Sequence, residues 1–200
     1  MTAEKHLGYA AIHFKSAEEW RKWLAKNHAK EESLFLIIYR KESGVPSVYY
    51  SEAVDEAICF GWIDSKINKR DAESYYQYFA KRNPKSNWSK VNKAKVEHLL
   101  SENKMAPAGL AMIELAKKTG TWTALDKVEE LELPAELEAA LNKNKIAKDY
   151  FDAFPRSVKR GILEWIMNAK REETKLKRIN ETVELAAKNV RANQYQRKEK

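Results

Sequence analysis

The sequence is poor in cysteine, glycine and proline, and it has no long apolar run. Of 200 residues, one is cysteine, six are glycine and five are proline. The single cysteine, Cys59, excludes an intramolecular disulfide, and its neighbours Ile58 and Phe60 indicate a buried, inert thiol. No Gly-rich phosphate loop is present. The longest apolar run, Leu34–Tyr39, is far too short to span a bilayer.

Other absences concern targeting and catalysis. The N-terminus lacks a basic segment followed by an apolar core and a cleavage site, so we expect a cytoplasmic protein. The four histidines do not have metal-ligand spacing, and neither a nucleophile elbow nor a paired-carboxylate signature is found. We therefore expect no metal, no cofactor and no catalytic residue of a known motif. The sequence favours a binding protein over an enzyme without deciding the question.

What is present is typical of a globular chain with an uneven charge distribution. Hydrophobic residues make up 44% and charged residues 33%, enough for one sizeable core or two small ones. The net charge is +8. Residues 66–95 hold nine Lys/Arg against two Asp/Glu, residues 156–200 hold thirteen against six, and the remainder sums to −6. Two basic blocks suggest an anionic partner, either a small molecule or a macromolecule.

The N-terminal half shows both helical and strand periods. We expect a short strand over 9–14, a helix after the capping box of Ser16 and Glu19, and a central strand in SLFLIIYRK. YSEAVDEAICFG reads as a helix with Ser51 as N-cap and Gly61 as its stop. From Trp62 the period is two, with one polar face, and YYQYFAKR reads as a returning strand.

Beyond Pro84 the pattern is helical. Helices are predicted from about 86–88 to 101, from 105–107 to Gly120, and from Pro134 to Pro155, followed by a long helix or a helical pair. TWTALDKVEELELP is the expected linker. The fold class is therefore α+β, with a small antiparallel or mixed sheet and two helices in the N-terminal half and a helical C-terminal half. We expect domains at 1–122 and 134–192, and a frayed tail over 193–200.

Four separated blocks resemble one known family. CFGWIDSKINK, FAKRNPKSNWSKVN, MAPAGLAMIELAKKTGTW and AKREETKLKRI closely resemble, in order, the signatures of the YdeI/OmpD-associated (OmdA) family. In the last block this chain has Lys175 and Lys177 where the family commonly has arginines. The resemblance implies a link to bacteriocin protection and antimicrobial-peptide resistance. It implies no catalytic residue or cofactor.

The sharpest hypothesis from the residues is an anion pocket between the strand pair and the SNWS helix. A helix start carries unpaired N–H groups and a positive dipole end, to which Arg82 would add charge. The alternative is that Ser86 only caps the helix and Trp88 only packs in the core. The expected ligand-binding residues are Trp62, Asp64, Lys66, Arg82, Ser86, Asn87, Trp88, Lys170 and Arg178.

Three competing functions stay open. One is a small-molecule enzyme whose scattered active site includes Asp64, although an ion pair between Asp64 and Lys81 or Arg82 is the favoured interpretation. A nucleic-acid surface is less favoured, because the basic C-terminal residues are interleaved with glutamates. The third is an interaction module with a protein partner.

Overall fold

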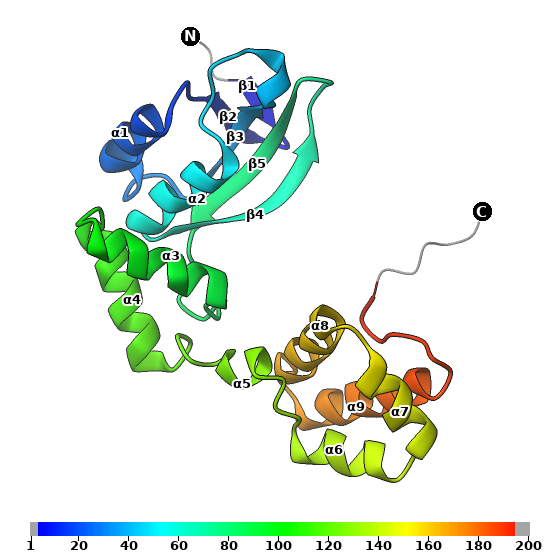
Figure 1. Cartoon of the computed structure of the whole chain (residues 1–200). Helices are drawn as coiled ribbons and strands as arrows, with labels where there is room; N and C mark the ends of the chain where they lie inside the picture. Colours follow the sequence, from blue (N-terminus) through cyan, green and yellow to red (C-terminus); the bar gives the residue numbers. More distant parts are fainter. Residues whose placement is uncertain (1–3, 195–200) are drawn as a thin grey trace. The chain divides into compact units, whose positions relative to one another are not determined.

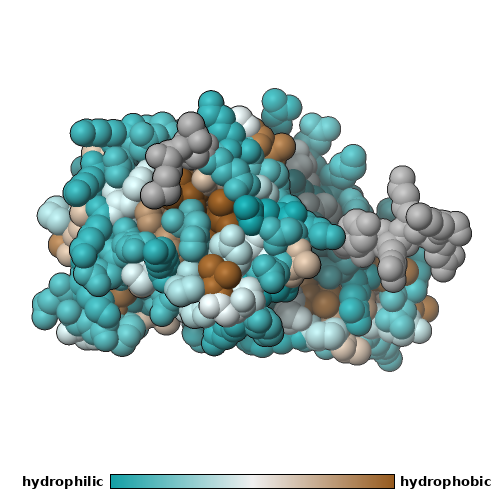
Figure 2. Space-filling model, turned by 90° about the horizontal axis from the view of Figure 1, so that it is seen from above, coloured by the Kyte–Doolittle hydropathy of each residue, from teal (hydrophilic) through white to brown (hydrophobic). Residues whose placement is uncertain are grey.

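The computed structural model describes residues 4–194, and these form two compact units. Unit 1 extends to Thr123 and unit 2 begins at Ala124. The predicted fraying of 193–200 falls mostly on 195–200, outside the described residues. Hydrophilic residues cover most of the face seen in Figure 2, and hydrophobic ones show there only in small separate patches.

Unit 1 is built on a five-stranded mixed sheet in the order β1-β2-β3-β5-β4. The strands β2 and β3 are parallel, and the other neighbouring pairs are antiparallel. The sequence pattern predicted every strand except the N-terminal edge strand. The strands are β1 (Glu4–His6), β2 (Tyr9–His13), β3 (Ser33–Tyr39), β4 (Trp62–Lys69) and β5 (Ser74–Lys81).

Two helices cover one face of this sheet (Figure 1). Helix α1 (Ala17–Asn27) begins after Ser16, whose hydroxyl accepts a hydrogen bond from the Glu19 N–H, as the capping box predicts. Trp20 of α1 and Leu36 of β3 are both fully buried in the larger core of unit 1. Helix α2 (Tyr50–Cys59) adds Ile58 to the same core.

The predicted cap of α2 is wrong. Its N-cap is Tyr49, whose backbone N–H donates to the Glu52 carboxylate at 3.0 Å. Ser51 instead accepts a hydrogen bond from Lys95 Nζ at 3.2 Å. The short 3-10 turn η1 (Lys41–Ser43) comes first, and α2 then begins two residues earlier than Ser51 as N-cap predicts.

A bulge interrupts the period-two pattern of β4. Asp64 pairs with Phe79 and Ile67 pairs with Gln77, so an advance of three residues along β4 corresponds to two residues along β5. The extra residue moves the later side chains to the opposite face. Ile67 therefore lies opposite Gln77, on the same side of the sheet as Asp64, whereas the uninterrupted pattern puts it on the side of Ile63; its side chain is 65% exposed.

Helices complete both units. Unit 1 ends with α3 (Lys90–Ser101) and α4 (Pro107–Thr119), and Gly120 caps α4 in the left-handed conformation at φ 79°. The segment from Pro134 to Pro155, predicted as one helix, is two, because Asn144 caps a new helix. Unit 2 consists of α5 (Asp126–Glu129), α6 (Ala135–Asn142), α7 (Lys145–Ala153), α8 (Arg156–Met167) and α9 (Glu172–Ala186). The predicted α+β class with a helical C-terminal half is confirmed, and the last segment is a helical pair.

Candidate functional site

The centre of the candidate site is the buried side chain of Arg82. Arg82 follows β5, and its backbone N–H donates to the Gly61 carbonyl at 2.9 Å. The residue is only 4% exposed. Its Nη2 donates to the Asn87 carbonyl at 2.6 Å, whereas Nε and Nη1 have no hydrogen-bond partner among the described residues. Buried donors are almost always satisfied, so two orphaned N–H groups on one cation call for an explanation.

Trp88 forms one wall of the site. The guanidinium carbon of Arg82 lies 3.8 Å from the centroid of the Trp88 ring, a close cation–π contact. Trp88 is 2% exposed, its N–H donates to the Thr121 carbonyl at 3.1 Å, and its ring packs on Trp122 at 5.1 Å. Trp88 therefore packs against the cation on one side and against the segment that follows α4 on the other.

The surroundings of Arg82 destabilise the charged form of its side chain. Burial lowers the pKa of the guanidinium to about 10, and the nearby negative charge of Asp64 acts in the opposite direction. A pKa of about 10 still leaves Arg82 protonated at neutral pH. The site thus holds a fixed positive charge that is poorly solvated and incompletely hydrogen-bonded.

Asp64 of β4 lies beside Tyr50, the first residue of α2. The Tyr50 hydroxyl donates to Asp64 Oδ2 at 2.8 Å. Burial, and next the hydrogen bond to Asp64, raise the pKa of Tyr50 to about 12. Of the two basic partners predicted for Asp64, Lys81 pairs in register with Trp62 and its ammonium forms an ion pair with Glu32 at 2.6 Å. Arg82 is the one whose pKa is affected by the Asp64 charge.

Trp62 lies in the core and not on a polar face. Gly61, at φ 74°, turns the chain from α2 into β4, so the Trp62 side chain enters the face covered by α1. Trp62 is 1% exposed, its ring meets Trp20 and Trp23 edge to face, and Nε1 donates to the His28 carbonyl at 3.2 Å. In this structure, neither face of that ring is open for stacking on a ligand.

The predicted helix start is also displaced. Ser86 lies in a turn, where its N–H and hydroxyl both donate to the Asn83 carbonyl, at 2.9 and 2.7 Å. The cap of α3 is Ser89, whose hydroxyl accepts from the Asn92 N–H. Asn87 contributes its carbonyl to Arg82, and Lys66 is exposed at the β4 bulge. Arg82, Asn87 and Trp88 therefore come together, whereas the Ser86 hydroxyl is used within its own turn and Lys66 is exposed.

Two predicted residues belong to unit 2. Lys170 is exposed between α8 and α9. Arg178 of α9 donates from Nη1 to the Trp165 carbonyl, and its guanidinium carbon lies 4.9 Å from the centroid of the Trp165 ring. That both residues bind the ligand stays a prediction.

Sequence reasoning missed two residues of the site: Tyr50, which contacts Asp64, and Trp122, which packs on Trp88. Tyr50 and Asp64 are 14 positions apart, and no local spacing rule pairs a helix start with the following strand. The only signal for Trp122 is its place in the block MAPAGLAMIELAKKTGTW, without an indication of what it contacts. Over residues 4–194, no three His, Cys, Asp or Glu side chains gather where they could hold a metal ion. Within that range, no helix is long and apolar enough to cross a membrane.

Fold and site together define a class: an α+β unit with a buried, partly unsatisfied arginine, joined to a helical unit. Residues 12–112, 101 of the 200, match the model of a domain of unknown function, DUF8412. Residues 130–189 match the family described as Bacteriocin-protection, YdeI or OmpD-Associated, OmdA. The chain belongs to the DUF8412 family by the first match, and its second unit carries the OmdA domain that the sequence motifs predicted. Comparisons with curated proteins and with solved structures returned no match.

Proposed function

We propose that this protein binds a small anionic ligand, with Arg82 as the cation that recognises it. The observation that carries the proposal is the pair of donors on Nε and Nη1, which lack partners among the described residues although the side chain is 4% exposed. A hydrogen bond between a charged donor and an anion is stronger than one between neutral groups. Folding removes the water molecules that would hydrogen-bond these two N–H groups. An anion that accepts hydrogen bonds from them would take the place of that water.

The neighbouring charges favour one class of anion. Asp64 is near enough that its carboxylate acts on the pKa of Arg82, and it repels any anion that approaches the same guanidinium. This repulsion grows with the charge of the ligand. We therefore expect a monovalent carboxylate to bind better than a divalent phosphate ester.

The test is thermal unfolding of the whole chain against acetate, benzoate, inorganic phosphate, a nucleoside monophosphate and a short oligonucleotide. A ligand that binds only the folded state raises the midpoint. Arg82→Met removes the charge at similar length, and Lys85→Gln removes an exposed charge of the same segment as a matched control. We expect a rise with a carboxylate that Arg82→Met abolishes and Lys85→Gln preserves. A shift that survives in Arg82→Met would reject Arg82 as the binding group.

One observation supports a second function, that of a small-molecule enzyme. Tyr50 and Asp64 form a hydroxyl–carboxylate pair at 2.8 Å beside the guanidinium, groups that general acid–base chemistry uses. A ligand that is chemically changed by the wild type, and unchanged by Asp64→Asn, would decide for catalysis. Stoichiometric binding without turnover would decide for the binding protein.

The family match connects the proposal with physiology. The OmdA match carries the description of bacteriocin protection, and we extend that role to this chain. We also propose that the protein is located in the cytoplasm, where the free thiol of the buried Cys59 stays reduced. Survival of cells that lack the protein, complemented with wild type or Arg82→Met, tests the role under bacteriocin challenge. Fractionation against periplasmic and cytoplasmic markers tests the location.

A further inference from the structure

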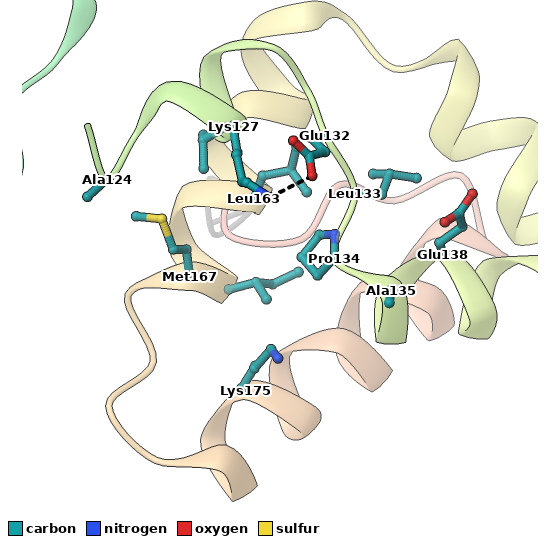
Figure 3. A pocket seen from close by; sticks show the side chains of 12 residues that line it. Ala124, Lys127, Glu132, Leu133, Pro134, Ala135, Glu138, Leu163, Met167 and Lys175 are labelled. Carbon is teal, nitrogen blue, oxygen red and sulfur yellow. Dashed lines mark hydrogen bonds and ion pairs between the residues drawn. The ribbon is translucent and has the colours of Figure 1, made fainter. Parts of the chain in front are cut away.

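Unit 2 contains a cavity of about 630 Å³ that the anion site does not use (Figure 3). Its volume falls within the range of small-molecule pockets, about 300–1,000 Å³. Eight of the twelve lining residues come from the segment 124–138, three come from the end of α8, and one, Lys175, comes from α9. The cavity is therefore formed where the irregular chain between α5 and α6 passes over two helices.

The cavity has an apolar floor. Val128, Leu163 and Ile166 line it and are 4%, 2% and 0% exposed. The half-buried residues Leu133 and Met167 extend the apolar lining toward solvent. A short aliphatic chain that binds here would transfer its apolar surface from water to the cavity. This transfer is favourable by about 25 cal/mol per Å² of apolar surface buried.

The two lysines of the lining already have anionic partners. Lys127 Nζ lies 2.9 Å from Glu132 Oε1, the pair joined by the dashed line in Figure 3. Lys175 Nζ lies 2.5 Å from Glu136 and 3.7 Å from Glu172. An incoming anion would have to displace one of these carboxylates.

Glu138 is the remaining charge of the lining. It projects from α6, and its carboxylate makes no ion pair or hydrogen bond within the described part of the chain. The uncompensated charge at the cavity is therefore negative. A cation could take a position near Glu138 without displacing an existing partner.

The segment 124–138, which supplies most of the cavity lining, also has a negative net charge. Residues 124–138 contain six Asp/Glu and one Lys, a net −5 in a chain of net +8. A cluster of one sign raises the local concentration of oppositely charged ligands. The charge of the wall thus acts in the same direction as the uncompensated carboxylate.

We infer that the cavity in unit 2 binds a cationic amphiphile, an aliphatic body that carries one ammonium group. The body lies on Val128, Leu163 and Ile166, and the ammonium lies toward Glu138. This site is separate from the anion site proposed for unit 1 and selects the opposite charge, so either proposal can fail without the other.

The test uses three probes of equal chain length: octylammonium, octanoate and octanol. Binding to the whole chain is measured by isothermal titration at low ionic strength. Glu138→Gln removes the uncompensated carboxylate, and Glu130→Gln removes an exposed carboxylate of the same segment that does not line the cavity. Ala135→Trp fills the cavity from the exposed start of α6, with Met167→Trp as a second filling variant.

We expect octylammonium to bind more tightly than octanoate or octanol. Glu138→Gln should weaken it about fivefold, which is the scale of one exposed charge pair. Glu130→Gln should leave it nearly unchanged, and a folded filling variant should abolish it. Equal or tighter binding of octanoate, equal losses in Glu138→Gln and Glu130→Gln, or no binding of any probe would overturn the inference.

Discussion

The guanidinium carbon of Arg82 lies over the ring of Trp88, 3.8 Å from the ring centroid, in the interior of unit 1. The ring occupies one side of the cation, and the Asn87 carbonyl accepts from one nitrogen. Two further donors stay without a partner in the described residues. Such an arrangement is unfavourable for folding, and the ligand recognition proposed above would account for its presence.

Replacing Arg82 should therefore stabilise the fold. Arg82→Met removes two unsatisfied buried donors, each of which costs about 1–3 kcal/mol, and loses one hydrogen bond and one cation–π contact worth about 1–2 kcal/mol each. We expect a net gain of about 1 kcal/mol in the free energy of unfolding. Urea denaturation at neutral pH measures it.

Arg70→Met is the control for this stability change. Arg70 donates to both Glu4 oxygens, to Asp71 and to Ser74, so its donors are well used. Hydrogen bonding to Glu4, the largest influence, raises the pKa of this guanidinium. Loss of these partners should destabilise by about 1–3 kcal/mol. Destabilisation of the same size in both variants would contradict the claim that Arg82 is unsatisfied.

Two glycines in helix interiors should respond to alanine with opposite signs. In α4, a Cβ at Gly109 would lie 2.3 Å from the Cys59 carbonyl oxygen, where Ala106 N–H also donates at 3.1 Å. Gly109→Ala should therefore cost about 2 kcal/mol or more through overpacking. In α8, a Cβ at Gly161 meets nothing closer than 4.0 Å, so Gly161→Ala should gain about 0.5–1 kcal/mol from helix propensity. Equal effects in thermal unfolding would disprove the close approach of α4 to the end of α2.

The edge strand β1 should contribute acid-sensitive stability. Hydrogen bonds from Arg70, and next from Tyr76, lower the pKa of Glu4 below 4.5. Because the folded-state pKa is the lower one, this contribution is complete above pH 4.5 and is lost as the pH falls below it. Glu4→Gln should be less stable than wild type at pH 7, by less than about 1 kcal/mol because the carboxylate is partly exposed. Urea midpoints of the two proteins should converge in acid, and a difference that stays constant with pH would refute the assignment.

Tyr50 provides an alkaline test of the candidate site. Its pKa is raised from 10.0 to about 12, so the associated stability is present below pH 10 and is lost as the pH rises toward 12. Wild type should then lose stability more steeply than Tyr50→Phe above pH 10. In Asp64→Asn, the pKa of Tyr50 measured from tyrosinate absorbance should fall only part of the way back toward 10.0, because burial is the larger cause of the shift. A complete return would mean that Asp64 alone perturbs Tyr50.

Much of the fold follows from local patterns. Ser16 with Glu19, Gly120, and the apolar run of β3 indicate helix ends and a central strand, because caps and periodicity act over a few neighbouring residues. Cap predictions failed where several local solutions compete. Ser86 and Ser89 both fit a helix start, and only the later one caps α3. Likewise, no local pattern in β4 indicates the bulge between Asp64 and Ile67.

The sequence by itself determined the α+β class, most of the element order, the basic segment that contains Arg82 and Trp88, and the family motifs. The tertiary structure alone decided that Arg82 and Trp62 are buried, that Tyr50 meets Asp64, and that an acidic segment closes a cavity in unit 2. The reason is physical. Helix caps and periods depend on contacts within about one or two turns, whereas burial and pairing depend on strand register and on which elements pack together. A basic residue in a polar stretch therefore predicts a solvated charge, and only the packed structure shows it enclosed beside an aromatic ring.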